Sequence, residues 1–507
     1  MTIDRDSGST DRPAGYTALI ERYSLNVIPN WHRSCIAMIN RHVVDKKEGI
    51  VRETYPARYW PGNSLGDHLE FALKYDGTNM AILAKIFHLV SIDEMVRFVQ
   101  SKPTGKYMRR LWYIFEKTTG TQLPVGDLTQ GNYLYVLEPS KYYTTDSIKR
   151  ISRQRVLDNF LGNDQFCPIV RRTEVLTDFE TASLQESCRE VMSSFPPDIL
   201  GRALSYLYTK ETKSSFEIEH ITPTADRMDR FVSLLGNSEH EDFCDKNHLI
   251  MLQNQIVDSR FADSDYRRTQ NYISSTISWD HEKIHYVCPK PDDIPDLMSG
   301  LVNTHLRISG GGIHPVVHAA VISYGFVFLH PFDDGNGRIH RFLIHNILAL
   351  RGFTPAQCIF PVSASMLKNP VEYNASLESL SNPLLPLIDY QLDNEGRMTV
   401  TNETGVWYRY IDLTLQTEAL FAFIENTIHT ELVEELTFLT NHDNARNALC
   451  RIVDMPDRLI SLFIKLCVQN NGYLSRNKRL SHFSSLSDRE VMRMEQAIRN
   501  VYDLDSI

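Results

Sequence analysis

Helical periodicity dominates the chain. Apolar residues recur at spacings of three and four over residues 66–101 and through most of residues 227–390, which is the pattern of amphipathic helices. A short run of β-favouring residues, 284–287, interrupts the second region and ends at Cys288-Pro289. We therefore predict a mainly α fold, in which an all-helical central domain carries one short β-hairpin.

Shifts in polarity divide the chain into five segments. We predict a flexible tail at 1–14, a mostly helical N-terminal region at 15–195, a helical central domain at 196–390, a polar connector with helices at 391–455 and a C-terminal module at 456–507. Ser-Ile-Asp-Glu at 91–94 and Ser-Asp-Arg-Glu at 487–490 are typical of capping boxes, so a helix is expected to begin at each.

One stretch without charged residues raises the question of a membrane span. No Lys, Arg, Asp or Glu occurs between Arg307 and Asp333, a length that nominally crosses a bilayer. Its densely apolar part, residues 316–329, is shorter and contains His318. We therefore predict a buried central helix and no membrane partner.

Composition narrows the class of protein. The 507 residues suffice for about three domains. Lys and Arg number 53 against 63 Asp and Glu, and the net charge of −10 excludes a general attraction to nucleic acid or anionic membrane. Any anion site must be local. The eight cysteines are dispersed without a CxxC pair, and the acidic, polar start lacks the features of a signal peptide, so we expect a cytoplasmic protein.

The chemistry is concentrated in HPFDDGNGRIHR, residues 330–341. An uncharged helix is expected to end at His330, and a Gly-rich turn then leads into a new helix near Gly337. Such a turn directs backbone N–H groups at one point and forms an anion cradle. Arg338 and Arg341, three residues apart, should share a helix face beside it.

Two further side chains complete this pattern. Asp334 offers a hard oxygen ligand of the kind that Mg²⁺ prefers, and His330 offers an imidazole that titrates near neutral pH. Each residue alone has an ordinary explanation: His330 could cap a helix, Asp334 could cap the next one, and Arg341 could be a solvated helix residue. Together they indicate a base, a metal ligand and a clamp for a polyphosphate.

The segment resembles the Fic family signature HxFx(D/E)GNGRxxR at every specified position. The resemblance implies a mostly helical Fic core that transfers AMP from ATP to a Ser, Thr or Tyr hydroxyl of a protein. It implies that His330 is the general base and that Asp334 positions Mg²⁺. It implies that Gly335, Asn336 and Gly337 hold phosphate oxygens and that Arg338 and Arg341 bind the polyphosphate, so that these residues and Asp334 form the nucleotide site.

A second segment, residues 213–220, resembles the inhibitory motif (S/T)xxxE(G/N) of the same family. Ser215 and Glu219 match the motif, whereas His220 stands where Gly or Asn is expected. The resemblance implies an inhibitory helix at about 204–220 whose Glu219 pairs with Arg341 and blocks placement of the γ-phosphate. The alternative is a solvated helical glutamate.

The family resemblance also covers a target-aligning flap. Residues 267–273 followed by 283–289 resemble the segment that leads into it, and we place the flap at about 276–289. In such a hairpin a target adds a strand, here beside Ile284, His285, Tyr286 and Val287. An isolated short strand is the alternative. Asn374 stands where relatives place contacts to the nucleotide base.

Residues 464–500 resemble the winged-helix-like module of many long Fic proteins. Arg476, Lys478 and Arg479 could contact DNA or an acidic partner there, although three basic residues on a loop are also typical of a solvated surface.

These observations predict an autoinhibited protein adenylyltransferase that uses ATP, Mg²⁺ and a protein substrate, with the chain itself among the candidate substrates. A homo-oligomer is left open. The alternatives are transfer of another phosphate-containing group, removal of AMP, or a nucleotide-sensing regulatory protein that binds DNA through its C-terminal module.

Overall fold

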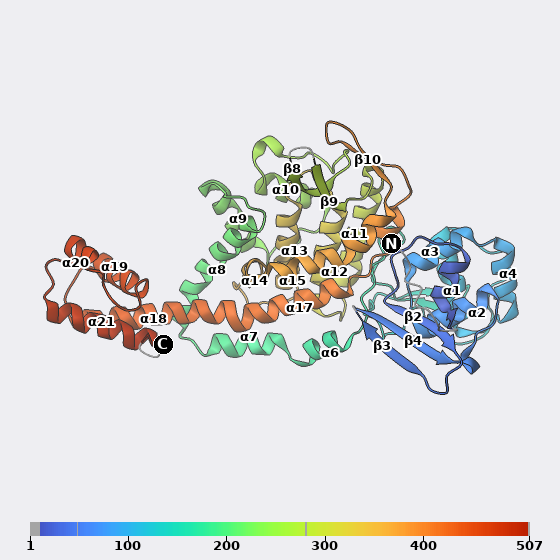
Figure 1. Ribbon diagram of the computed structural model, residues 1–507, viewed down its shortest axis with the longest axis horizontal. Helices are drawn as coiled ribbons and strands as arrows, with labels where there is room; N and C mark the ends of the chain where they lie inside the picture. Colours follow the sequence, from blue (N-terminus) through green and yellow to red (C-terminus); the bar gives the residue numbers. More distant parts are fainter. Residues whose placement is uncertain (1–10, 48, 279–280, 505–507) are drawn as a thin grey trace.

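The computed structural model describes residues 11–47, 49–278 and 281–504. It is elongated, with the N-terminal region at one end, a helical body in the middle and the C-terminal module at the other end (Figure 1). One continuous hydrophobic core joins the N-terminal helices to the helical body, and a separate core holds the C-terminal module. The prediction of a mainly α fold is confirmed. None of the helices in these described ranges is long and apolar enough to cross a membrane.

A four-stranded sheet lies at the N-terminal end, in the order β1-β2-β4-β3. Its strands are β1 (Arg12–Ala14), β2 (His32–Ala37), β3 (Val43–Lys47) and β4 (Ile50–Pro56). Of the tail predicted at 1–14, residues 1–10 lie outside the described residues. The prediction is wrong at Arg12–Ala14, because this segment pairs antiparallel with β2 and so has hydrogen-bond partners that its polar sequence does not reveal.

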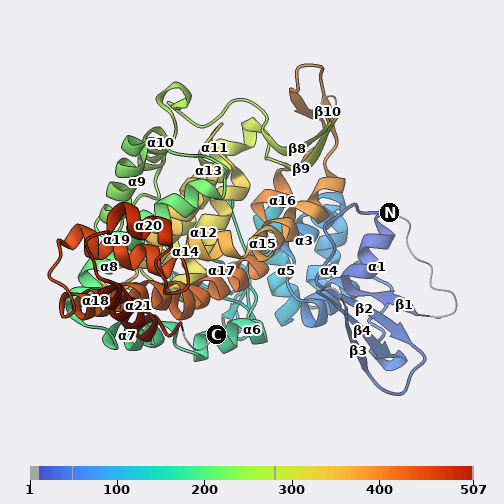
Figure 2. The same ribbon diagram turned by 60° about the vertical axis from the view of Figure 1, so that its left-hand side comes forward.

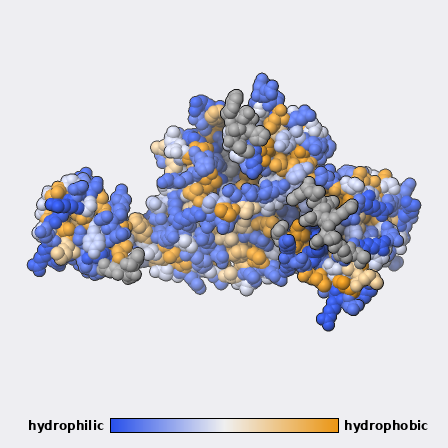
Figure 3. Space-filling view, in the orientation of Figure 1, coloured by the Kyte–Doolittle hydropathy of each residue, from blue (hydrophilic) through white to orange (hydrophobic). Residues whose placement is uncertain are grey.

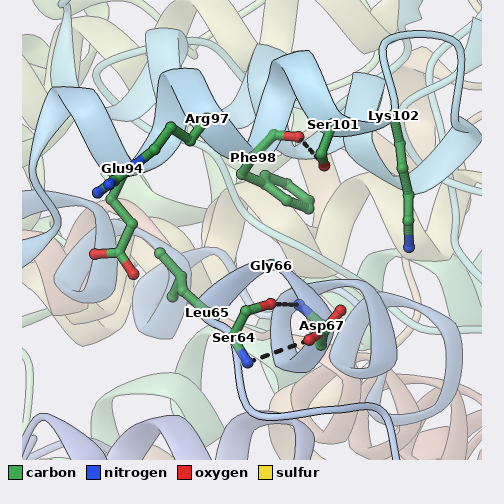
Figure 4. Close-up of a pocket in the computed structure, with 9 residues that line it drawn as sticks. All are labelled: Ser64, Leu65, Gly66, Asp67, Glu94, Arg97, Phe98, Ser101 and Lys102. Carbon is green, nitrogen blue, oxygen red and sulfur yellow. Dashed lines mark hydrogen bonds between the residues drawn. The ribbon is translucent and has the colours of Figure 1, made fainter.

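The helices of this region are α1 (Gly15–Arg22), α2 (Leu65–Phe71), α3 (Met80–Leu89), α4 (Ile92–Ser101), α5 (Lys106–Thr119), α6 (Glu174–Thr181) and α7 (Leu184–Ser193). The side chains of Ser64 and Asp67 form a capping box at the start of α2 (Figure 4). Gly66 lets α4 approach closely, since a Cβ there would collide with the ring of Phe98. At the predicted box of α4, Ser91 Oγ accepts from the N–H of Glu94.

A second small sheet corrects the prediction that residues 15–195 are mostly helical. It has the order β5-β7-β6 and contains β5 (Leu134–Tyr135), β6 (Lys149–Ile151) and β7 (Val156–Asp158). Helices are present as expected, but both sheets are built from short strands, and each includes a parallel pair. Such pairing joins residues far apart in sequence, so local periodicity does not predict it.

The central body contains α8 (Pro197–Glu217), α9 (Ala225–Asn237), α10 (Lys246–Ile256), α11 (Ile294–Ser309), α12 (Pro315–Leu329), α13 (Asn336–Leu350), α14 (Val362–Lys368) and α15 (Pro370–Leu384). Every residue of α12 after Pro315 is buried, so the charge-free stretch is the expected central helix. It packs along α13 and against α11. This packing fixes the loop between α12 and α13, which holds residues 330–335.

Two β-hairpins stand side by side at one edge of the body (Figures 1 and 2). The first consists of β8 (Tyr272–Ser278) and β9 (His281–Val287), so the flap predicted at 276–289 begins earlier, at Tyr272. The second consists of β10 (Tyr390–Leu392) and β11 (Met398–Val400). The polar connector predicted from residue 391 is therefore wrong here. β10 and β11 are only three residues long, too short to show an alternating pattern of apolar and polar residues.

The C-terminal part consists of α16 (Gly405–Arg409), α17 (Thr414–Asn426), α18 (Leu432–Cys450), α19 (Asp457–Val468), α20 (Arg476–His482) and α21 (Asp488–Tyr502). The separate core includes Ala445 and Leu449 of α18, so the module begins before residue 456. Within residues 456–504 the regular elements are helices alone, and the expected wing strands are not found. The three basic residues expected on a loop lie on α20. The predicted capping box at the start of α21 is confirmed.

Candidate active site

The loop between α12 and α13 is closed by its own side chains. His330 ends α12 with a left-handed backbone, at φ 50°. The buried Phe332 donates its N–H to Asn336 Oδ1 at 3.1 Å, and Asn336 Nδ2 donates to the Phe332 carbonyl at 2.8 Å. Gly335 makes the final turn at φ 91°. Because the amide of Asn336 is engaged in this closure, Asn336 offers a ligand its backbone N–H and not its side chain.

The protonation state of His330 follows from its neighbours. Its Nδ1 lies 3.2 Å from the Val327 carbonyl, which can only accept, so Nδ1 carries the proton and Nε2 has its lone pair free. Burial, together with the positive charge of Arg267, lowers the pKa of His330 to about 4. Arg267 also donates to the His330 carbonyl at 2.7 Å. The imidazole is therefore a neutral base near pH 7.

His330 faces a cavity of about 630 Å³. One wall is the segment 269–272, which leads into β8 of the flap. Another part of the wall is the β10–β11 hairpin, through residues 393 and 396–399. Asp333 of the loop also lines the cavity, and its Oδ1 accepts from Thr269 Oγ1 at 3.1 Å. The base thus lies between two hairpins in a space large enough for a polypeptide side chain and its neighbours.

An anion cradle forms at the start of α13. The first-turn N–H groups of Asn336, Gly337 and Arg338 have no carbonyl partner within the helix, as at any helix N-terminus. The side chains of Arg338 and Arg341 are 0% and 2% exposed. Two buried cations beside a helix N-terminus require a negative partner, because an unpaired buried charge is strongly unfavourable.

The carboxylate of Glu219 is that partner. Its Oε1 lies 2.8 Å from Arg341 Nη2, and its Oε2 lies 2.7 Å from Arg338 Nε. It also covers the helix start, because a Cβ at Gly337 would collide with Oε1. The sequence predicted a contact with Arg341 alone, whereas the structure shows Glu219 bridging both arginines. A carboxylate therefore stands where the cradle would receive a phosphate.

Ser215 and Tyr373 complete the surroundings of Arg341. Arg341 Nε donates to Ser215 Oγ at 2.9 Å, and Nη2 donates to the Ser215 carbonyl at 2.6 Å. The Tyr373 hydroxyl accepts from Nη1 at 3.5 Å. These contacts come from α8 and α15, so the orientation of Arg341 is set by helices far apart in the sequence.

A buried anchor holds α8 against the body. Glu211, fully buried, accepts from His345 Nε2 of α13 at 2.7 Å and from the N–H of Ser363 in α14 at 2.8 Å. Lys210 forms an ion pair with Glu431 at 2.9 Å. This anchor fixes the end of α8, and therefore Glu219, over the cradle. The predicted inhibitory helix at 204–220 corresponds to the second half of α8 and the turn that follows it.

The backbone conformation at residue 220 explains why His can stand where the motif has Gly or Asn. Its backbone is left-handed at φ 55°, a conformation that Gly and Asn adopt readily and that His adopts more often than most residues. The position therefore requires a backbone conformation and no particular side chain.

Replacing His220 with Gly is expected to raise the free energy of unfolding by about 1 kcal/mol, because Gly adopts this conformation without the Cβ clash. Urea denaturation measures the change. His220→Ala retains the Cβ and is the matched control, for which we expect no gain. Equal midpoints for the two variants would contradict this explanation.

Comparison with known proteins identifies this region. Residues 243–348 match the model of the Fic/DOC family. A protein adenylyltransferase Fic of Nematostella vectensis is 38% identical over 90 residues, which cover 18% of this chain and 19% of that protein. The protein adenylyltransferase Fic of Culex quinquefasciatus is 35% identical over 94 residues, covering 18% and 16%. The chain contains a Fic domain.

The chain spans about a fifth of the length of the curated relatives it matches. Among solved structures, a Fic family protein from Desulfovibrio desulfuricans G20 aligns at 16% identity with a TM-score of 0.35, covering 65% of this chain and 87% of that one. The residues that match the family model run from just before α10 into α13. They include the loop, the flap and the cradle but not α8 or the β10–β11 hairpin.

Asp334 of the Fic domain is the expected metal ligand. Its Oδ1 lies 2.6 Å from Arg338 Nη2, and its side chain is 45% exposed. The described residues contain no group of three or more His, Cys, Asp or Glu side chains that could hold a metal alone. A single accessible carboxylate beside a phosphate cradle suits Mg²⁺, which takes one or two carboxylates together with phosphate and water oxygens.

The remaining predicted residues lie in two places. Ile284, Tyr286 and Val287 of the flap are buried against the body, and His285 lies 2.7 Å from Ser275 Oγ across the hairpin. In contrast, Ile273 of β8 is exposed. Asn374 is exposed on α15 and has no hydrogen bond to the loop among the described residues. Its predicted contact with the nucleotide base stays a prediction.

Sequence reasoning missed three residues that shape the Fic site. Arg267 lies in the segment already noted before the flap, so its position signalled a role. Tyr373 is adjacent to Asn374, so the segment was indicated but not this residue. Gln253 of α10 gives no signal at all, yet its amide donates to Asp263 Oδ2 at 3.1 Å, and the same oxygen accepts from the N–H of Asp333 at 3.3 Å.

Proposed function

We propose that the protein is an adenylyltransferase that transfers AMP from ATP to a hydroxyl of a protein, and that Glu219 inhibits it. The observation that carries the proposal is the carboxylate of Glu219 held by two buried arginines at a helix N-terminus, beside a histidine with a free Nε2. A site that binds a carboxylate in this way is built for phosphate oxygens. The names of the relatives support transfer of AMP.

In the proposed reaction the target hydroxyl enters the cavity and contacts His330 Nε2. His330 takes the hydroxyl proton while the oxygen attacks the α-phosphorus. A bond forms between the target oxygen and phosphorus, and the bond to the bridging oxygen of the β-phosphate breaks. Pyrophosphate leaves with the electron pair, while Arg338, Arg341 and the N–H groups of α13 stabilise its charge.

Mg²⁺, held by Asp334 and the phosphates when bound, would neutralise part of the phosphate charge. Glu219 and the nucleotide compete for the same arginines, so the carboxylate must move away before the terminal phosphate can enter. The proposed inhibition is therefore direct competition between a carboxylate of the chain and the nucleotide.

The pKa of His330 predicts the pH dependence. A general base works in its deprotonated form, and a pKa lowered to about 4 leaves His330 deprotonated throughout the neutral range. We expect kcat/KM for transfer to stay level from about pH 8 to about pH 6 and to fall only below about pH 5. A half-maximal value near pH 6.5, the ordinary pKa of histidine, would contradict the assigned environment.

Mass spectrometry of the protein after incubation with ATP and Mg²⁺ tests the function. We expect a mass increase of one AMP on a Ser, Thr or Tyr, with pyrophosphate released in equal amount. An increase of one phosphate, or of a group from another phosphate-containing donor, would show that the protein catalyses a reaction other than AMP transfer. Loss of AMP from a previously modified protein would indicate the reverse activity.

A further inference from the structure

The β10–β11 hairpin forms part of the wall of the cavity that His330 faces. Residues 390–400 belong to neither the matched Fic segment nor α8, and nothing in the proposed reaction uses them. Yet the hairpin lines the same cavity as His330, and the Tyr272 hydroxyl of β8 donates to the Gly396 carbonyl at its tip at 2.9 Å. The two hairpins thus touch at the mouth of the cavity.

Several hydrogen bonds hold the β10–β11 hairpin, which we call the wall, in one conformation. At its tip, Asp393 Oδ1 accepts from the N–H groups of Glu395 and Arg397 at 2.9 and 2.8 Å. At its base, the N–H of Asp389 donates to Asn402 Oδ1 at 3.1 Å. Such side-chain contacts fix a turn in one conformation. A segment that reaches His330 through this cavity therefore meets a wall of defined shape.

The base of the wall is tied to the body as well. Asn402 Nδ2 donates to the Leu387 carbonyl at 2.8 Å, and Glu403 pairs with Lys290 at 2.7 Å, close after the end of β9. The hairpin therefore stands on the same part of the body as the flap.

Acidic side chains outnumber basic ones on this side of the cavity. The charged lining residues are Asp333 of the loop and Asp393 and Arg397 of the hairpin, and Glu395 adds a further negative charge at the hairpin tip. The guanidinium of Arg397 is engaged by Asp393 at 3.3 Å and by Glu395, so its charge is balanced within the tip. The tip projects as a hydrophilic protrusion beside the flap (Figure 3). An acidic wall favours a basic partner by charge complementarity.

We infer that the β10–β11 hairpin is the second wall of a target groove, and that it selects extended segments with Lys or Arg next to the modified hydroxyl. The inference rests on the proposed AMP transfer. The flap aligns one edge of the target strand, as a sheet edge does in β-augmentation, and the hairpin contacts the side chains that flank the hydroxyl. Asp393 and Glu395 are the specificity residues.

Two synthetic peptides test the inference. Both carry the same Ser, Thr and Tyr hydroxyls in an extended sequence, one flanked by lysines and one by glutamates. The Glu219→Gly protein, whose cradle is free, is assayed for peptide binding by fluorescence anisotropy and for AMP transfer with α-labelled ATP. We expect tighter binding and faster transfer for the lysine-flanked peptide.

The variant Asp393→Asn/Glu395→Gln removes two charges from the tip while the amide of residue 393 can still accept the two N–H groups. We expect the preference for the lysine-flanked peptide to fall by about threefold to tenfold, with the affinity for ATP unchanged. The matched control is Glu186→Gln/Glu190→Gln, which removes two exposed charges from α7 and should leave the preference intact.

Each outcome decides between the claims. An unchanged preference in the Asp393→Asn/Glu395→Gln variant, or no preference in the parent, overturns the inference about the hairpin while leaving AMP transfer in place. Selective binding of the lysine-flanked peptide without transfer supports the groove and contradicts the proposed function. Absence of both binding and transfer contradicts both.

Discussion

Replacing Glu219 with Gly is expected to raise auto-AMPylation by about tenfold to a hundredfold. In the parent protein the carboxylate occupies both Arg338 and Arg341, and the nucleotide must displace it. A hydrogen bond to a charged group contributes about 1.5–3 kcal/mol, and about 1.4 kcal/mol corresponds to a factor of ten. Removing the carboxylate leaves the arginines ready for phosphate.

The fold should survive this change. Arg341 retains its contacts with Ser215, and Arg338 retains Asp334 and the Ile256 carbonyl. Glu217→Gly is the matched control, because Glu217 is exposed at the end of α8 and has no contact with the arginines among the described residues. Equal labelling of the Glu219→Gly and Glu217→Gly proteins would show that Glu219 does not inhibit.

Replacing His330 with Ala is expected to slow transfer by about 10² to 10⁴, the usual contribution of a general base. The free Nε2 of His330 is the proton acceptor that the cavity presents to an incoming hydroxyl. Because the arginines and the start of α13 are the proposed binding site of the nucleotide, the affinity for ATP should change little. Single-turnover labelling and a separate binding measurement distinguish the two effects.

The exposed His88 of α3 supplies the matched control. His88→Ala should retain full activity, since it lies in the N-terminal region. A His330→Ala protein that binds ATP and labels its target at the parental rate would remove His330 from the mechanism and leave the cradle as a binding site alone.

The site could be predicted from the sequence because its parts are local. His330, Asp334, Arg338 and Arg341 lie within twelve consecutive residues, so a short loop and the first turns of one helix keep them close together. The buried α12 could also be predicted, since an apolar helix without charges must lie in a core. Ser215 and Glu219 were found through a motif, and the structure brings both to Arg341.

What could not be predicted depends on contacts between distant segments. β2 and β4 pair in parallel with β3 between them in the sequence, and β10 and β11 have three residues each, so neither pattern is visible along the chain. The second contact of Glu219, to Arg338, follows from how α8 crosses the start of α13. The pKa of His330 depends on Arg267, which reaches the loop from a segment 63 residues earlier.

Labelling the Glu219→Gly protein with ATP that carries its label at the α or at the γ position tests the central claim most directly. The account predicts that label from the α position alone becomes attached to the protein, and that the double variant Glu219→Gly/His330→Ala loses it. Covalent label from the γ position, or α label that persists without His330, would contradict transfer of AMP by this site.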